Sequence, residues 1–382
     1  MEKLKGIYWM AKRVLMVATV PSMIGQFNIK NIYILLDMGC EVDVAADFTD
    51  TSMWPTERIQ KLKDELSDLG IESIQLNFSR SPLKINRHID SYKETLKLIQ
   101  ERQYSFIHTH TPIASAIVRL AAHKTATKVV YTAHGFHFYD GAPLKNWLIF
   151  YPVEKWLSKY TDVLITINQE DYRRAKEKFY AKKIVYVPGV GVDIEKFAPR
   201  QSGRDRIRAE LGLKESDIML LSVGELNENK NHSSVIRAVA GMELTYVIVG
   251  KGEKSGELER LSKEFGVDVR LVGFRTDVAD FYDAADVYAL PSIREGLNVS
   301  LMEAMASGLA VVCGRIRGNT DLIENEGCLF DPVNMDEIRK AIILAIENRE
   351  ELSRSNLQKI KHFDLSTVDN ITSEIYRRGT GI

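Results

Sequence analysis

Short apolar runs alternate with longer stretches of helical spacing along most of the chain. In the first half the apolar runs have the length of strands and fall at residues 13–20, 41–45, 71–76, 106–108, 128–132, 163–167 and 184–187. Apolar residues at helical spacing separate them, at 27–38, 59–69, 89–101, 114–123, 143–159 and 169–179. Strands that alternate with helices in this way form βαβ units, whose strands run parallel. The first half therefore predicts one parallel sheet covered by helices.

A turn-rich stretch at 188–199 interrupts the pattern, and we place a domain boundary there. The second half then predicts strands at 218–223, 245–249, 269–272, 287–290 and 310–313, and helices near 231–241, 254–265, 276–284, 298–307, 318–325 and 335–348. The sequence thus predicts an α/β fold of two Rossmann-like, doubly wound parallel-sheet domains, 1–190 and 191–365, facing a central cleft. A last helix within 366–382 is expected to cross back to the first domain.

Composition narrows the class of protein without naming a partner. The chain has 382 residues, 45% of them hydrophobic and 27% charged, with a net charge of −1, which is typical of a soluble globular protein. The first 190 residues carry a net charge of +6 and the rest −7. A basic first half fits an anionic surface or acceptor, although ordinary fluctuation explains the difference equally well.

Three cysteines are too few and too scattered for a disulfide framework or a metal site, so we expect core residues and a reducing compartment. No run reaches 18 uninterrupted apolar residues, and the apolar stretch at 6–11 is too short for the core of a signal peptide. We therefore expect a cytoplasmic protein without a membrane span.

Two carboxylates eight residues apart suggest a binding site. Glu295 follows the predicted strand 287–290, and Glu303 lies inside the next predicted helix. The helix start between them offers free N–H groups and a positive dipole end, which suit a phosphate. One carboxylate could then hold sugar hydroxyls and the other a ribose. Helix capping alone explains many such pairs, so the neighbouring motifs have to decide.

Those motifs follow the strands of the second half in order. They read Ser222-Val-Gly-Glu-Leu-Asn-Glu-Asn-Lys-Asn231, Val249-Gly-Lys-Gly-Glu253, Val272-Gly-Phe-Arg275, and Glu295-Gly-Leu-Asn followed by Glu303-Ala-Met-Ala-Ser-Gly-Leu-Ala310. With His108-Thr-His110, Thr132-Ala-His-Gly135 and Val187-Pro-Gly-Val-Gly-Val-Asp193 in the first half, this order resembles the retaining glycosyltransferases of family 4, which have the GT-B fold. The first half is most similar to enzymes that build bacterial capsular polysaccharides, exopolysaccharides and lipid-linked oligosaccharides.

The resemblance implies a role for each matching position. Lys230 would contact the donor diphosphate, Glu295 the hydroxyls of the donor sugar, and His134 the sugar near the reacting centre. Glu303 would bind the ribose hydroxyls. The remaining donor-binding positions that it implies are Gly25, Gly250, Gly273, Phe274, Arg275, Gly296, Leu297 and Asn298. Each has a bland alternative, such as a solvated lysine, a core histidine or a simple turn glycine.

Glu225 stands where the resembled family usually has arginine, and a carboxylate cannot pair with a diphosphate. Arg294, Arg315 or Arg317 could replace that cation, while Glu225 could form an ordinary ion pair or orient Lys230.

Residues Pro21 to Gly25 are interpreted as a loop that makes room for the acceptor and the diphosphate. No cofactor is expected, and no metal, because no Asp-x-Asp motif and no matched ligand set accompany the histidines.

A basic and aromatic set in the first half suits a lipid-linked acceptor at an anionic membrane surface: Arg80, Lys84, Arg87, Lys145 and Trp147. Packing of the aromatic residues into the core of a long helix kinked at Pro152 is the equally weighted alternative.

The expected activity is metal-independent transfer of a sugar, with retention, to a hydroxyl of a lipid-linked saccharide in bacterial surface polysaccharide synthesis. The expected donor is a nucleotide-diphosphate sugar, either a UDP-hexose or a UDP-N-acetylhexosamine. The protein would bind no nucleic acid and would associate with the inner face of the plasma membrane. A sugar-nucleotide epimerase of GT-B type and a non-catalytic two-lobed sugar-nucleotide-binding protein are the alternatives.

Overall fold

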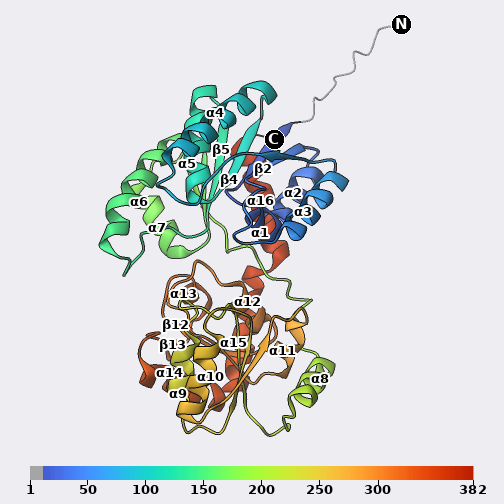
Figure 1. The fold of residues 1–382 in the computed structure, drawn as a ribbon, viewed down its shortest axis with the longest axis vertical. Helices are drawn as coiled ribbons and strands as arrows, with labels where there is room; N and C mark the ends of the chain where they lie inside the picture. The colour runs from blue at the N-terminus through green and yellow to red at the C-terminus, as the bar shows by residue number, and fades with distance from the viewer. Residues whose placement is uncertain (1–11, 382) are drawn as a thin grey trace. The chain divides into compact units, whose positions relative to one another are not determined.

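The computed structural model describes residues 12–381 and divides into two compact units. Within that range, unit 1 contains the chain up to Ile167, then Asp171–Val187 and the segment from Asp369 on, whereas unit 2 contains Asn168–Glu170 and Pro188–Val368. The apolar stretch at 6–11 lies outside the described residues. Figure 1 colours unit 1 mainly blue to green and unit 2 mainly yellow to orange.

Unit 1 is built on a seven-stranded sheet in the order β3-β2-β1-β4-β5-β6-β7, with every neighbouring pair parallel. Its strands are β1 (Arg13–Val17), β2 (Glu41–Ala46), β3 (Glu72–Gln75), β4 (Phe106–His110), β5 (Lys128–Ala133), β6 (Val163–Thr166) and β7 (Lys183–Tyr186). The helices are α1 (Pro21–Phe27), α2 (Ile29–Asp37), α3 (Thr56–Asp68), α4 (Ile85–Arg102), α5 (Pro112–Thr125), α6 (Leu144–Leu157) and α7 (Gln169–Lys178).

Unit 2 repeats this plan with six parallel strands in the order β10-β9-β8-β11-β12-β13. Its strands are β8 (Met219–Val223), β9 (Thr245–Val249), β10 (Asp268–Gly273), β11 (Val287–Leu290), β12 (Ala310–Gly314) and β13 (Leu329–Phe330). The helices are α8 (Gln201–Leu211), α9 (His232–Ala238), α10 (Ser255–Phe265), α11 (Val278–Ala284), α12 (Val299–Ala306), α13 (Asn319–Leu322), α14 (Met335–Glu347) and α15 (Arg349–Ile360). The predicted class of two parallel α/β sheets is confirmed.

Continuous apolar strands form the core of each unit, as parallel strands covered on both faces require. β9 and β11 are buried along their whole length, and so are all but the first residues of β1 and β5. Cys40, Cys313 and Cys328 are free and buried, as the sequence predicted. The strand runs were therefore the most reliable signal in the sequence.

The chain ends in unit 1. Helix α16 (Leu365–Ile375) begins in unit 2, and the segment from Asp369 belongs to unit 1, where the red ribbon lies among blue elements (Figure 1). Lys12 Nζ donates to the carbonyl of Gly381 at 2.7 Å, and Lys128 Nζ donates to that of Thr380 at 2.8 Å. Tyr376 is fully buried. These contacts attach the C-terminal segment to the residue before β1 and to the first residue of β5.

Some elements differ from the prediction. The reading of residues 21–25 as a loop was wrong, because Pro21 begins helix α1, a position that proline favours. Helices α8 and α15 and strand β13 were not predicted. Helix α8 has a strongly polar sequence with few apolar residues to reveal its period, and β13 has two residues. Short or mostly polar elements carry too little periodic signal for a prediction.

Candidate active site

In unit 2 two predicted residues meet where the strand order reverses. Strands β8 and β11 are neighbours, and the loops that follow them carry Lys230 and Glu295. Lys230 Nζ donates to Glu295 Oε1 at 2.6 Å, and both side chains are partly buried. Ligands of doubly wound sheets bind outside the carboxyl ends of the strands at this reversal point. The ion pair therefore lies where the fold places a ligand.

An asparagine-rich loop holds the two strand ends together. The side-chain amide of Asn231 donates to the carbonyls of Pro291 and Pro332, at 3.2 and 2.8 Å. Asn229 Nδ2 donates to the carbonyl of Arg294 at 3.0 Å. Asn231 also adopts a left-handed φ of 53°, which asparagine tolerates better than most residues. Sequence reasoning missed these asparagines, although their spacing of every second residue was visible.

Lys230 is positioned from its backbone outwards. Asn227 Oδ1 accepts from the Lys230 N–H at 3.0 Å, and Asn227 Nδ2 donates to Glu225 Oε2 at 2.9 Å. The aliphatic part of the Lys230 side chain lies over Gly224, where a Cβ would come within 3.3 Å of it. Glu225 therefore acts on Asn227, which holds Lys230. This contact matches the alternative in which Glu225 orients the lysine.

Of the three arginines that could replace the expected cation, Arg317 lies beside the pair. Its Nε and Nη2 each donate to the carbonyl of Glu295 at 3.4 Å. Arg315 instead pairs with Glu326. Arg294 is exposed, and its carbonyl receives the Asn229 amide.

Three predicted donor-binding residues shape the turn before helix α12. Gly318 packs on the carbonyl oxygen of Gly296 so closely that no side chain fits at Gly318, whose φ is 82°. Leu297 packs against Gly189. Asn298 caps the helix, since its Oδ1 accepts from the N–H of Leu301 at 3.0 Å. The helix start that the sequence offers to a phosphate is thus already capped at Leu301.

Glu303 lies further along helix α12, away from this turn. Its Oε2 accepts from the hydroxyl of Tyr282 at 2.8 Å, and burial raises its pKa, while Tyr282 and the charge of Lys196 act against that rise. Burial also raises the pKa of Tyr288, and the charges of Glu303 and Glu295 both contribute. Both predicted carboxylates therefore act on one tyrosine of β11.

The glycine-rich turns after β9 and β10 adjoin one another. The Gly250 N–H donates to the carbonyl of Gly273 at 2.9 Å, and a side chain at Gly250 would collide with the carbonyl of Gly224. Phe274 is 67% exposed. Arg275 turns away, because its guanidinium donates to Glu210 and Asp277 at distances of 2.8–3.1 Å. The predicted donor-binding positions in these turns thus divide into two adjoining glycines, an exposed phenylalanine and an arginine already paired with carboxylates.

In unit 1 the predicted histidine lies in a row of three rings at the carboxyl ends of β4 and β5. His134 Nε2 is 3.1 Å from His110 Nδ1, and the rings of His110 and His108 lie 4.2 Å apart between centroids. Burial lowers the pKa of His134 to about 4 and that of His108 to about 3, and His110 moves in the same direction. All three rings are neutral at pH 7.

Thr111 is a further residue at this edge of the sheet, and sequence reasoning did not select it. It follows β4 with a φ of 69°, which is strained for a β-branched residue, and its hydroxyl lies 2.6 Å from that of Thr19 after β1. These two strands flank the order reversal of unit 1. Gly25 lies inside α1 instead of in a loop, and the ring of Trp54 fills the space that its missing side chain leaves.

The acceptor-surface residues separate into two groups. Trp147 is partly buried and packs against Phe138 and Tyr151, on the face of α6 that turns to the core. This contact favours the alternative in which the aromatic residues pack into the core. Lys145 is exposed on the opposite face. That outer face carries large exposed hydrophobic residues: Leu144, Leu148, Ile149, Val153 and Trp156.

The basic residues before and within α4 also differ from one another. Arg87 is tied down, since its Nη2 donates to Asp47 at 2.7 Å. Arg80 reaches Ser52 at 3.4 Å, and Lys84 is exposed between Leu83 and Ile85, which are 86% and 65% exposed. The start of α4 is thus a second exposed apolar segment of unit 1.

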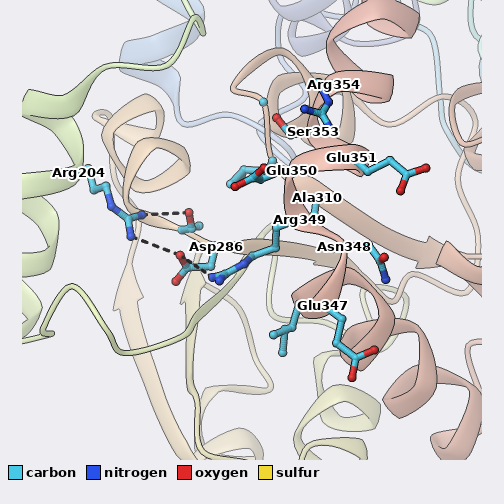
Figure 2. A pocket seen from close by; sticks show the side chains of 14 residues that line it. Arg204, Asp286, Ala310, Glu347, Asn348, Arg349, Glu350, Glu351, Ser353 and Arg354 are labelled. Carbon is cyan, nitrogen blue, oxygen red and sulfur yellow. Dashed lines mark hydrogen bonds and ion pairs between the residues drawn. The ribbon is translucent and has the colours of Figure 1, made fainter.

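A hollow of about 630 Å³ in unit 2 lies away from these residues (Figure 2). Its lining includes Asp286, just before β11, and residues 308–310 at the start of β12, so it opens at the amino edge of the sheet. Arg204 and Arg349 point toward Asp286, each 3.3 Å from its carboxylate. The hollow contains none of the predicted site residues.

Among residues 12–381, no helix is both long and apolar enough to cross a membrane. No group of three or more histidine, cysteine or carboxylate side chains in the same range is arranged to hold a metal ion.

The fold and the site define a glycosyltransferase of the GT-B class. Residues 35–196 match the family model described as Glycosyltransferase Family 4, and residues 203–361 match the model described as Glycosyl transferases group 1. EpsD of Bacillus subtilis (strain 168) is 35% identical over 328 residues, which cover 83% of this chain and 82% of EpsD. The chain belongs to the family 4 glycosyltransferases.

A second curated relative and one solved structure are also similar to this chain. The UDP-Gal:alpha-D-GlcNAc-diphosphoundecaprenol alpha-1,3-galactosyltransferase of Escherichia coli is 30% identical over 268 residues, 66% of this chain and 69% of that enzyme. Among solved structures, HepE of Anabaena in complex with UDP superposes with a TM-score of 0.77 at 19% identity, over 95% of this chain and 98% of HepE. The structural likeness supports the fold.

Proposed function

We propose that this enzyme transfers a sugar from a UDP-sugar to a hydroxyl of a lipid-diphosphate-linked saccharide, with retention at the anomeric carbon. The observation that carries the proposal is the 2.6 Å ion pair between Lys230 and Glu295 at the order reversal of unit 2. The specificity of the related Escherichia coli enzyme, printed in its name, supports the choice of donor and acceptor classes.

In this proposal Lys230 and Glu295 contact different parts of the bound donor. The ammonium of Lys230 faces the diphosphate and stabilises the negative charge that develops on it. Glu295 then accepts hydrogen bonds from sugar hydroxyls, and Glu303 accepts those of the ribose. His134 contacts the donor sugar. The positive charge of Lys230, with Arg317 beside it, makes a bound metal unnecessary for leaving-group departure.

The bond changes balance without a protein nucleophile. The bond between the anomeric carbon and the diphosphate oxygen breaks, and a bond from that carbon to the acceptor oxygen forms on the same face. The acceptor proton passes to the departing diphosphate. Exclusion of water then limits hydrolysis of the donor.

We further propose that the outer face of α6 contacts an anionic membrane. Five apolar side chains from Leu144 to Trp156 are 47–72% exposed there. Lys145 and Lys159 are exposed on the same helix face and its extension, while the one acidic residue of α6, Glu154, is buried against Arg119 at 2.9 Å. An apolar surface flanked by lysines and free of exposed acids is typical of a helix that lies on anionic lipid.

The activity is tested by UDP release from a panel of UDP-sugars, with and without a lipid-diphosphate-linked monosaccharide. We expect release that depends on the acceptor, and a product with the anomeric configuration of the donor. Conversion of the UDP-sugar without an acceptor would instead indicate an epimerase. Tight binding without turnover of any donor would indicate a binding protein. Either outcome overturns the proposal.

A further inference from the structure

The neighbours of His110 determine which nitrogen of each ring carries a proton. His110 is fully buried, with Nδ1 3.1 Å from His134 Nε2 and Nε2 3.2 Å from the sulfur of Met16. A thioether sulfur accepts hydrogen bonds and cannot donate them. A lone pair of Nε2 facing that sulfur would leave a buried polar atom opposed by another lone pair, which is costly. The proton of His110 therefore belongs on Nε2.

The consequence passes to His134 through the bond between the rings. A neutral imidazole has one N–H, so Nδ1 of His110 is an acceptor. His134 must then donate from Nε2, and its own Nδ1 carries a lone pair. The low pKa values of both histidines agree with neutral rings, since burial disfavours the charged form.

We propose that Met16 and His110 are positioning residues that hold His134 as the Nε2–H tautomer and so present its Nδ1 as a hydrogen-bond acceptor. A ligand that meets this nitrogen has to offer a donor, such as a sugar hydroxyl. The tautomer follows from the geometry within unit 1, whereas its use in recognising the donor sugar rests on the proposed function.

His108 provides an internal comparison. It lies on the same strand as His110 and is equally buried, but its nitrogens meet the hydroxyls of Tyr376 and Thr132, each at 2.8 Å. A hydroxyl can donate or accept, so these partners fit either tautomer of His108. The rings of His108 and His110 are tilted by 44° to one another, and the hydrogen bonds of His108 go to Tyr376 and Thr132 instead of to His110. Changes at Tyr376 should therefore leave His134 unaffected.

The direct test is nitrogen-15 NMR of the whole protein with labelled histidine at pH 7.5. The chain has eight histidines, and a His134→Phe spectrum assigns the signals of His134 by their absence. We expect a protonated Nε2 and an unprotonated Nδ1 in His134, without ligand. A protonated Nδ1, or two tautomers in similar amounts, would overturn the proposal without any measurement of activity.

Two variants test the route. Met16→Leu removes the acceptor at similar volume, and we expect His134 to become a mixture of tautomers, with kcat about two- to tenfold lower and the donor KM little changed. Tyr376→Phe is the matched control, with the His134 signals unchanged. An unaltered His134 in Met16→Leu, or an equal effect of Tyr376→Phe, would contradict the route through Met16.

Failure of the wider function looks different. Full acceptor-dependent turnover in His134→Phe would remove His134 from the proposed donor contact, while the tautomer measured in the native protein would still stand. The NMR result and the kinetic result therefore refute separate statements.

Discussion

The two units share one strand order but place different chemistry where it reverses. In unit 2 the loops after β8 and β11 bring together opposite charges, Lys230 and Glu295, near the surface. In unit 1 the ends of β1, β4 and β5 bring together hydroxyls and neutral histidine rings, most of them buried. The fold thus determines where a ligand can bind, and the loop residues determine which part of it each unit can handle. In the proposed function, neutralisation of the diphosphate charge belongs to Lys230 of unit 2, whereas unit 1 offers the donor sugar the uncharged ring of His134.

The largest effect should follow from removal of the cation of unit 2. We expect Lys230→Ala to lower kcat by at least about two orders of magnitude, the scale of losing one group that stabilises transition-state charge. Turnover of a saturating UDP-sugar with acceptor measures this loss. Lys359→Ala is a matched control, because Lys359 Nζ also donates to a carboxylate, that of Glu324, at 2.6 Å, but both residues lie outside the loops after β8 and β11.

The control keeps its activity if the comparison is right. Equal losses in Lys230→Ala and Lys359→Ala would show that turnover depends on the general charge of unit 2. Glu295→Ala with full turnover in a folded protein would remove the second member of the pair from the site.

A smaller effect is expected at Glu303. Hydrogen bonds to a charged group contribute about 1.5–3 kcal/mol, so Glu303→Gln should weaken UDP-sugar binding about ten- to hundredfold and leave kcat within about threefold. Calorimetric titration with UDP and steady-state KM for the donor measure this. Tyr282→Phe keeps the carboxylate and removes its 2.8 Å hydrogen bond, so it should weaken binding less. A fall in kcat at constant KM would place Glu303 in the transition state and not at the ribose.

The sequence predicted the two sheets and the loop positions of the main site residues, because buried parallel strands are continuous apolar runs and ligands bind at their carboxyl ends. It did not predict partners. The bonds of Asn231 to Pro291 and Pro332, and of Tyr282 to Glu303, join residues far apart in the chain. Gly25 was placed in a loop because proline and glycine together favour a turn, although proline also favours the first position of a helix. The inward packing of Trp147 was not predicted because a residue type does not reveal which side of a helix packs inward. Only the helical phase of the folded chain shows it.

The comparison extends to the outer surface, where unit 1 carries the apolar face of α6. We expect the protein to bind vesicles containing anionic lipid and to bind zwitterionic vesicles much less, with binding that weakens as salt rises. Leu148→Ser should reduce partitioning about tenfold, the scale of withdrawing one buried leucine side chain from an apolar environment. Val333→Ser in unit 2 is the matched control, since Leu148 and Val333 are both 69% exposed. Flotation that is equal for both variants would place the membrane contact elsewhere.

The smallest effect concerns acid stability, which should differ between the units. In the folded protein the pKa is about 3 for His108 and about 4 for His134, below the 6.5 of an ordinary histidine, and burial lowers the pKa of His110 as well. Unit 2 has one buried histidine of this kind, His232, with a pKa of about 4. Between pH 6.5 and 4 these histidines are protonated in the unfolded chain but neutral in the folded protein. The free energy of unfolding therefore decreases as the pH falls through that window. Each such histidine contributes at most about 1.4 kcal/mol per pH unit, or a few °C in melting temperature for a unit of this size.

Trp54, Trp147 and Trp156 lie in unit 1, and residues 188–368 contain no tryptophan, so tryptophan fluorescence follows unit 1 while circular dichroism follows both. Between pH 7 and pH 5 we expect the melting temperature of unit 1, measured by fluorescence, to fall by several °C more than the melting temperature of unit 2. The melting temperature of unit 2 is the midpoint of the circular-dichroism transition that fluorescence does not report. Equal shifts by the two probes, or a rise on acidification, would contradict the view that unit 1 contains more buried neutral histidines than unit 2.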